Sequence, residues 1–163
     1  MLNAEWISFF SAQIGASATL TGLLVVAISI NLSRILSIPQ LPGRAAEGLI
    51  IMAGAFVLSS LALVPNHSAT AFAVEALAVG LVTFLWPLII QLRSWKSVVE
   101  GVSLVMQIER LVAGAAASLP FVIGGAVLAC GSATGLYWLA AGVIVSLLVS
   151  VWNAWVLLIE ILR

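Results

Sequence analysis

Few side chains in this sequence could do chemistry, and Glu75 has the most unusual setting among them. It lies in the segment ATAFAVEALAVG, within a long apolar run that contains no lysine or arginine. A carboxyl group inside a membrane span is energetically costly, so it usually faces a cavity or a partner. If the protein has a functional centre, we expect it at Glu75. Two roles stay open: an ionised group that attracts cations, or a dry structural hydrogen bond.

A second group of polar residues lies in SAQIGASATLTG, residues 11–22, inside the first apolar run. Gln13, Ser17 and Thr21 are four residues apart, so on a helix they form one row. One interpretation is that this row, together with Glu75, lines a pore or polar cavity. The other is that its side chains bond to neighbouring helices.

The same segment carries a row of small residues, which consists of Ser11, Gly15, Thr19 and, close to the same line, Gly22. Small residues let helix backbones approach closely in membranes. We therefore expect the first span to be the central and most buried helix, shielded from lipid by its own bundle or by a second copy of the chain.

Other kinds of site are disfavoured by residue counts. The chain has one histidine, one cysteine (Cys130) and no aspartate, which argues against a metal site, a disulfide and a Ser/His/Asp triad. We therefore expect no catalytic residue, no metal and no cofactor. His67, in the turn PNHS, is either a neighbour of Glu75 or simply solvated. Glu47 follows Arg44 by three residues, which predicts a surface ion pair.

Composition sets the class of the protein. The 163 residues are 63% hydrophobic and only 7% charged, with a mean hydropathy of +1.26. A soluble domain needs about 25% charged residues, so this chain is expected to be an integral membrane protein in a lipid bilayer. Its net charge is zero and it has no basic run, which argues against a nucleic-acid partner.

The predicted fold class is all-α, a polytopic transmembrane helix bundle that forms a single domain over residues 1–163. A span needs about 20 apolar residues, and five runs qualify: 6–31, 45–64, 69–92, 110–130 and 135–160. The basic residues fall in the first and third links and at the C-terminus, which predicts an outside N-terminus and a cytoplasmic C-terminus. The third link, residues 93–110, is expected to form an interfacial helix or an extension of span four. Pro87 and Pro120 predict kinks in spans three and four.

The segments GASATLTGLLVVAISINLSRIL and LPGRAAEGL, residues 15–36 and 41–49, resemble the N-terminal part of a family of small bacterial integral membrane proteins. Some members of that family are described as modulators of a membrane-bound protease. The resemblance covers about the first two spans, and it implies a multi-pass protein of the bacterial inner membrane without a catalytic residue.

Two functions are compatible with these features. The first is a homo-oligomeric channel or transporter for ions or small solutes, because the first span is polar and one carboxyl group lies within a span. The second is a non-catalytic structural or regulatory subunit of another membrane complex, such as a membrane-bound protease, which docks through its small-residue faces.

Overall fold

The long apolar runs form helices, in which each segment satisfies its own backbone hydrogen bonds, as a segment able to span a membrane must. The computed structural model describes residues 3–38, 41–96 and 104–158, with the side chains of 94–96 and 104–106 left aside. Within these ranges the chain is helical and has no strands. The six helices are α1 (Ala4–Ile30), α2 (Leu32–Ser37), α3 (Leu41–Ala62), α4 (Ala69–Lys96), α5 (Leu104–Ala129) and α6 (Gly135–Leu158).

Five of these helices are long and apolar enough to cross a membrane, so the predicted number of spans is confirmed for the described residues. At most helix ends, the observed bounds differ from the predicted ones by one to six residues. The first link is not a simple break, because it contains the short helix α2. Much of the third link belongs to the ends of α4 and α5, and residues 97–103, where the interfacial helix was expected, lie outside the described residues.

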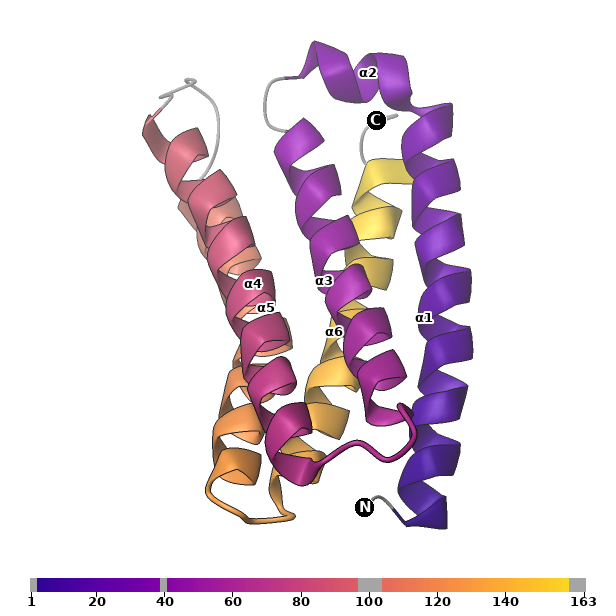
Figure 1. Ribbon diagram of the computed structural model, residues 1–163. Coiled ribbons are helices and arrows are strands. Elements are labelled where there is room, and N and C mark those ends of the chain that lie inside the picture. The colour runs from indigo at the N-terminus through magenta and orange to yellow at the C-terminus, as the bar shows by residue number, and fades with distance from the viewer. Residues whose placement is uncertain (1–2, 39–40, 97–103, 159–163) are drawn as a thin grey trace.

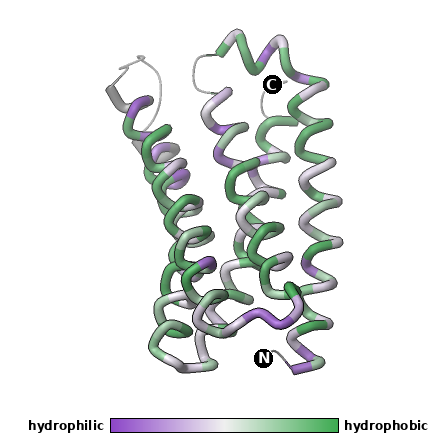
Figure 2. Tube along the Cα trace, viewed as in Figure 1, coloured by the Kyte–Doolittle hydropathy of each residue, from purple (hydrophilic) through white to green (hydrophobic). Residues whose placement is uncertain are grey.

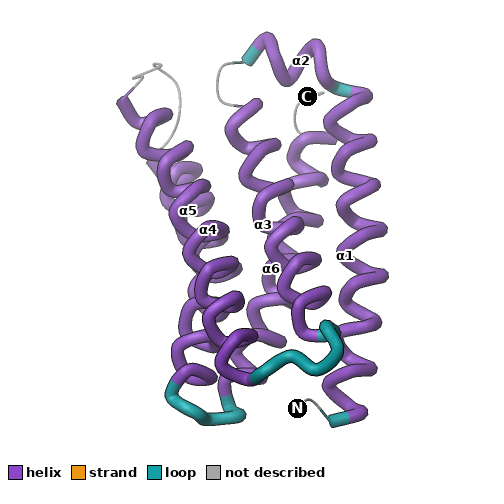
Figure 3. Tube along the Cα trace, in the orientation of Figure 1, coloured by secondary structure: helices purple, strands orange, loops and turns teal. Residues whose placement is uncertain are grey.

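The five long helices run side by side, and α2 lies across one end of the bundle (Figures 1 and 3). Neighbours in contact are α1 with α3, α3 with α4, α4 with α5, α5 with α6, and α6 with α1. In addition, α3 packs against α6 across the middle. The helices α3 and α6 therefore form the centre, and α1 lies at one edge.

The expectation that the first span is the central and most buried helix is wrong within the single chain. Only 17% of the apolar window of α1 is buried, against 50% for α3. A β-carbon added to Gly15 or Gly22 would meet no atom within 4 Å. The small-residue row of α1 is therefore not a packing surface inside this bundle.

Close backbone packing occurs instead at glycines of α4, α5 and α6. A β-carbon on Gly80 of α4 would lie 2.7 Å from the backbone nitrogen of Val122 on α5, and one on Gly125 of α5 would lie 2.7 Å from that of Leu77 on α4. Gly124 of α5 and Gly135 of α6 face each other in the same way. Because only glycine leaves room at these contacts, the sequence positions of the glycines fix where the helices cross.

The two prolines at which kinks were predicted lie inside helices, Pro87 in α4 and Pro120 in α5. A proline at position 87 has no N–H for the carbonyl oxygen of Thr83, four residues earlier. The hydroxyl of Ser118 on α5 lies 3.3 Å from that oxygen, and it donates to the nearer carbonyl oxygen of Gly114 on its own helix as well. A side chain of the neighbouring helix thus compensates in part for the backbone bond that Pro87 removes.

Charge is distributed unequally between the two ends of the bundle. The N-terminus lies at one end and the C-terminus at the other (Figure 1). Arg34, Arg44, Arg93 and Arg110 all belong to helix segments at the end that carries α2. Along the tube in Figure 2 the long helices are mostly hydrophobic, and hydrophilic positions gather near helix ends and in the α3–α4 connection.

The single native cysteine offers a direct test of sidedness. Cys130 is exposed in the turn between α5 and α6, at the end opposite to α2. Because lysine and arginine collect on the cytoplasmic side, we expect a membrane-impermeant thiol reagent to label Cys130 from outside the cell. In a Cys130→Ala background, Ser37→Cys in α2 should react only after the membrane is permeabilised. Labelling of both positions from the same side would contradict five crossings.

Matched glycine substitutions separate packing within the chain from the outer surface of α1. We expect Gly125→Ala to destabilise the purified protein by about 1–3 kcal/mol, because the new methyl group would press on the α4 backbone. Gly22→Ala is the control, since it meets open space and replaces glycine by a better helix former. Thermal unfolding in detergent measures both. Equal melting temperatures for Gly125→Ala and the parent would show that the α4–α5 crossing is looser than described.

Candidate functional site

A cluster of charged and amide side chains lies within the bundle near the end that carries α2. Its centre is Glu47, which comes from the second turn of α3 and is only 4% exposed. Arg110, from α5, binds both carboxylate oxygens: its Nη2 donates to Oε1 over 2.7 Å and its Nε donates to Oε2 over 3.3 Å. This two-bond arrangement is the strongest geometry between arginine and a carboxylate.

Three further side chains complete what we call the Glu47 cluster. The side-chain amide of Gln91, on α4, donates a hydrogen bond to the Glu47 carboxylate. Arg44, one turn before Glu47 on α3, is close enough for Coulombic attraction. Asn153, on α6, packs against Gly48. The cluster therefore draws on all four helices α3, α4, α5 and α6.

The cluster surrounds a small cavity of about 10 Å³, which is close to the least space that one water molecule needs. Pro87 and Gly114 form part of its wall together with the charged groups. At its edge, Glu109 accepts a hydrogen bond of 3.1 Å from the indole Nε1 of the exposed Trp152. The cavity is too small for an organic substrate.

The charges of this region compensate one another, since Arg44 and Arg110 balance Glu47 and Glu109. Buried charges are tolerated only when they are paired and hydrogen-bonded. Helices α3 and α5 touch at few other places, so the Glu47–Arg110 pair is a main tie between them. The arrangement is therefore suited to holding four helices in register at this end.

The predicted surface pair between Arg44 and Glu47 is wrong. Both residues are buried, and the hydrogen-bonded partner of Glu47 is Arg110, which lies 63 positions later in the sequence. The expectation failed because three-residue spacing reports only neighbours on the same helix. The face of α3 that carries both residues turns toward the bundle, which one-dimensional spacing does not reveal.

The row Gln13, Ser17 and Thr21 faces the inside of the single bundle rather than an open path. Ser17 is completely buried, and its hydroxyl donates to the carbonyl oxygens of Gln13 and Ile14. Thr21 donates in the same way to the carbonyl of Ser17. Gln13 differs from the other two residues of this row, because its buried side-chain oxygen Oε1 has no hydrogen-bond partner in the described part of the chain.

Glu75 lies beside His67, as one of the two interpretations of that histidine predicted. The carboxylate Oε2 is 3.2 Å from Nε2 of the imidazole, and the side chain of Glu75 is 38% exposed. The other ring nitrogen, Nδ1, lies 3.2 Å from the carbonyl oxygen of Leu61. Ser59 and Ser60 of α3 do not bond to Glu75, since Ser60 donates to the carbonyl oxygen of Phe56 and the Ser59 hydroxyl has no partner within the described ranges.

The structure does not bring Glu75 together with the polar row of α1. Glu75 belongs to α4 and the row belongs to α1, and these helices lie at opposite edges with α3 and α6 between them (Figure 1). A common cavity lined by Gln13, Ser17, Thr21 and Glu75 is therefore not formed within one chain.

Sequence reasoning missed the Glu47 cluster as a site. One signal was available: Arg44, Glu47, Gln91 and Arg110 all lie near the ends of predicted spans that meet on the same side of the membrane. That signal gives a shared depth, but it does not say which faces of the helices meet. The described residues contain no group of three or more His, Cys, Asp and Glu side chains that could hold a metal ion.

No family model, curated protein or solved structure matches this chain. The similarity of residues 15–36 and 41–49 to bacterial inner-membrane proteins therefore stays a prediction. Functional inference depends on the contacts within the bundle and on the surfaces that the bundle leaves exposed.

A double-mutant cycle tests the role of the Glu47–Arg110 pair. We expect Glu47→Gln to destabilise the protein by about 3 kcal/mol or more, because it leaves the largely buried guanidinium group of Arg110 without the carboxylate that it binds. Arg110→Gln should cost less, since Arg44 still attracts Glu47. The double variant should lose less stability than the sum of the two single changes.

Glu109→Gln is the matched control for this cycle, because Glu109 neighbours Arg110 but is exposed. Its effect on the unfolding free energy should stay near or below about 1 kcal/mol. The measurement is unfolding in detergent, followed by helical circular dichroism. Additive effects of Glu47→Gln and Arg110→Gln would show that the pair contributes nothing as a pair.

Proposed function

We propose that this protein is a non-catalytic multi-pass membrane subunit that works as an assembly held together by the outward surface of α1. The observation that carries this proposal is the exposure of Ser11, Gly15, Ala18, Thr19 and Gly22 on one side of that helix. We call these five residues the α1 outer face. They lie roughly opposite to the buried Ser17 and Leu24 on the helix wheel.

The α1 outer face has the composition of a helix–helix contact rather than of a lipid-facing surface. Lipid-facing positions elsewhere in the bundle carry large apolar groups, for example Val74, Trp86 and Leu148. The outer face carries only glycine, alanine and short hydroxyl side chains. Small residues let two backbones come close enough for direct van der Waals contact, which drives helix association where the hydrophobic effect is absent.

The spacing of the outer face favours a particular geometry. Ser11, Gly15, Ala18 and Gly22 are separated by four, three and four residues, which is the alternation of a left-handed helix pair. No charged residue interrupts the face. The Thr19 hydroxyl donates to the carbonyl oxygen of Gly15 on its own helix, so it offers a partner its lone pairs as acceptors. Such a face is compatible with itself, so the partner that we propose is a second copy of the chain.

The contacts of the other polar row favour this function over a channel. A pore lined by Gln13, Ser17 and Thr21 would require these side chains to face water. Ser17 is instead completely buried in its own bundle. The hydroxyl groups of Ser17 and Thr21 both donate to backbone carbonyl oxygens of α1. The row therefore supports packing of α1 on its own chain, while the outer face is left for a partner.

Transport of a small ion is the second candidate, and the Glu47 cluster is the observation that favours it. Ionisable groups within spans often mark ion pathways, and this cluster adjoins a cavity with room for about one water molecule. The balance of its charges and the small size of the cavity support a structural role more strongly. Under either function, we place the protein in the bacterial inner membrane with its C-terminus in the cytoplasm.

Substitutions on the α1 outer face test the assembly. We expect the parent to form oligomers in mild detergent, and the combined change Gly15→Leu and Gly22→Leu to shift it toward the monomer. Both new side chains meet open space within the chain, so the melting temperature of the monomer should be little changed. Mass from light scattering after size exclusion, measured over a range of protein concentrations, reports the assembly.

The matched control is Val74→Leu, which enlarges an exposed apolar residue on α4 and leaves α1 intact. It should keep the parental mass. A parent that is monomeric at every concentration, in detergent and in nanodiscs, would overturn self-assembly through α1. Ion flux through liposomes that contain the parent, abolished by an inactivating change in the Glu47 cluster with the assembly intact, would favour the transport candidate instead.

A further inference from the structure

A groove of about 390 Å³ opens on the outside of the bundle between α1 and α6. Its α1 wall includes Leu20, Leu23 and Ile30, and its α6 wall includes Trp155 and Leu158. Met52 of α3 lies at its floor and is almost completely buried. The groove is therefore a concave surface with contacts available on three sides.

The lining of the groove is apolar apart from Ser150, and this serine offers it little polarity. The Ser150 hydroxyl is buried and donates to the carbonyl oxygen of Gly48 over 3.5 Å. Trp155 adds one indole N–H at the end of the groove near α2, and the other lining side chains are hydrocarbon or thioether. A groove with so few hydrogen-bonding groups, open toward the hydrocarbon of a bilayer, suits an apolar occupant.

The length of the groove matches one leaflet of a bilayer. From Leu20 to Ile30 the α1 wall rises about 15 Å, at ~1.5 Å per residue. This is half of the roughly 30 Å hydrocarbon thickness, and therefore the reach of one acyl chain. A partner helix would cross the whole bilayer and would need a groove along the full length of α1, so the dimensions favour a lipid chain over a helix.

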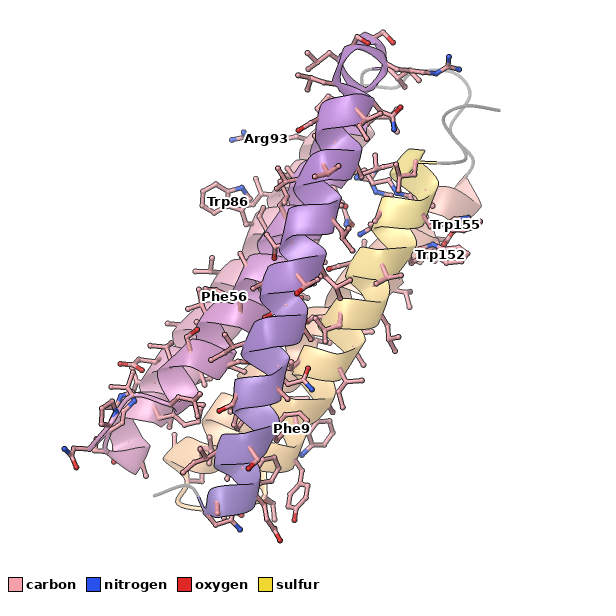
Figure 4. All side chains as sticks on the ribbon, turned by 90° about the vertical axis from the view of Figure 1, so that its right-hand side faces the viewer. Phe9, Phe56, Trp86, Arg93, Trp152 and Trp155 are labelled. Carbon is pink, nitrogen blue, oxygen red and sulfur yellow. The ribbon has the colours of Figure 1, made fainter. Side chains whose placement is uncertain are left out.

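The end of the groove near α2 carries groups that suit a lipid headgroup. Asn31 directly follows the groove residue Ile30, and its side chain donates a 3.1 Å hydrogen bond to the carbonyl oxygen of Leu157, which ties α1 to α6 at this end. The next helix, α2, exposes Arg34 together with Leu32 and Leu36. Trp155 and Trp152 project from α6 near the same end (Figure 4), where indole rings favour the membrane interface.

We propose that the α1–α6 groove binds one acyl chain of an anionic phospholipid, whose phosphate is held by Arg34. Arg34 follows Ile30 by four residues, so it lies within about 14 Å of the groove end even along a fully extended chain. Its guanidinium group is exposed and matches the geometry of a phosphate. The groove and the α1 outer face are separate surfaces of α1, and the site does not depend on the proposed assembly.

Three variants test the lipid site in the full chain, reconstituted in nanodiscs of equimolar phosphatidylglycerol and phosphatidylcholine. The protein is then extracted in mild detergent, and retained lipids are counted by native mass spectrometry. We expect the parent to keep one phospholipid per chain, mainly phosphatidylglycerol. Ala154→Trp, which fills the groove, should lose most of it. Ala141→Trp, on an exposed position of the same helix outside the groove, should retain it.

Arg34→Gln tests the contact with the lipid headgroup separately from the contact with the acyl chain. It should still retain a lipid, but its preference for phosphatidylglycerol over phosphatidylcholine should fall about fivefold, because one arginine near an anionic surface contributes about that factor.

Retention by Ala154→Trp equal to that of the parent, or no headgroup preference in the parent, would overturn the proposal. A change of protein mass in Ala154→Trp would identify a second copy as the occupant and would also overturn it. The α1 assembly is tested by the protein mass of the Gly15→Leu and Gly22→Leu variant and the lipid site by the lipid that Ala154→Trp retains, so the two proposals fail independently.

Discussion

The bundle depends on direct contact between helix backbones, which is the contact that drives association of helices where the hydrophobic effect is absent. Gly80 and Gly125 let α4 and α5 touch along their backbones, and Gly124 and Gly135 do the same for α5 and α6. These contacts build the half of the bundle that contains α4, α5 and α6. The central helices α3 and α6 then join this half to α1.

A second constraint is that polar groups inside a span must find partners within the protein. Short hydroxyl side chains meet it locally by donating to the backbone of their own helix, as Ser17, Thr21 and Thr83 do. Pro87 leaves the carbonyl oxygen of Thr83 without its backbone donor, and the Ser118 hydroxyl of the next helix shares its hydrogen between this oxygen and the carbonyl of Gly114.

Charged groups need partners from farther away. Glu47 lies about two turns inside α3 and is satisfied only because α4 and α5 bring Gln91 and Arg110 to the same place. The cluster thus makes the position of one helix depend on three others. A buried pair of this kind adds less to stability than its Coulombic attraction suggests, but it strongly disfavours arrangements in which the charges are separated.

The helix α1 has packing contacts with other helices on one side only. Its inward side buries Phe10, Ser17 and Leu24, and Trp6 packs edge-on against Tyr137 with ring centroids 5.1 Å apart. Its outward side has the small residues of a helix contact but no helix opposite them. Between α1 and α6 the apolar groove is likewise open. The proposed function and the proposed lipid site therefore both rest on surfaces at the edge of the bundle rather than on a cavity at its centre.

The sequence by itself determined the number and approximate bounds of the five apolar helices, since about 20 consecutive apolar residues are both necessary and visible in one dimension. The order of the short segments also indicated the end that collects arginines. It left open whether His67 neighbours Glu75 or is solvated, and the folded chain selects the first. Helical spacing placed Ser11, Gly15 and Thr19 in one row of α1 and Gln13, Ser17 and Thr21 in another.

Only the tertiary structure decided which of these rows faces inward and which side of α3 is buried. Periodicity gives the angle between two residues on one helix, but it does not give the direction of the neighbouring helix. For this reason α1 was expected at the centre and lies at the edge, and Glu47 was expected to pair with Arg44 on its own helix. It pairs instead with Arg110, because the crossings at the glycines set how α5 lies beside α3 and α4.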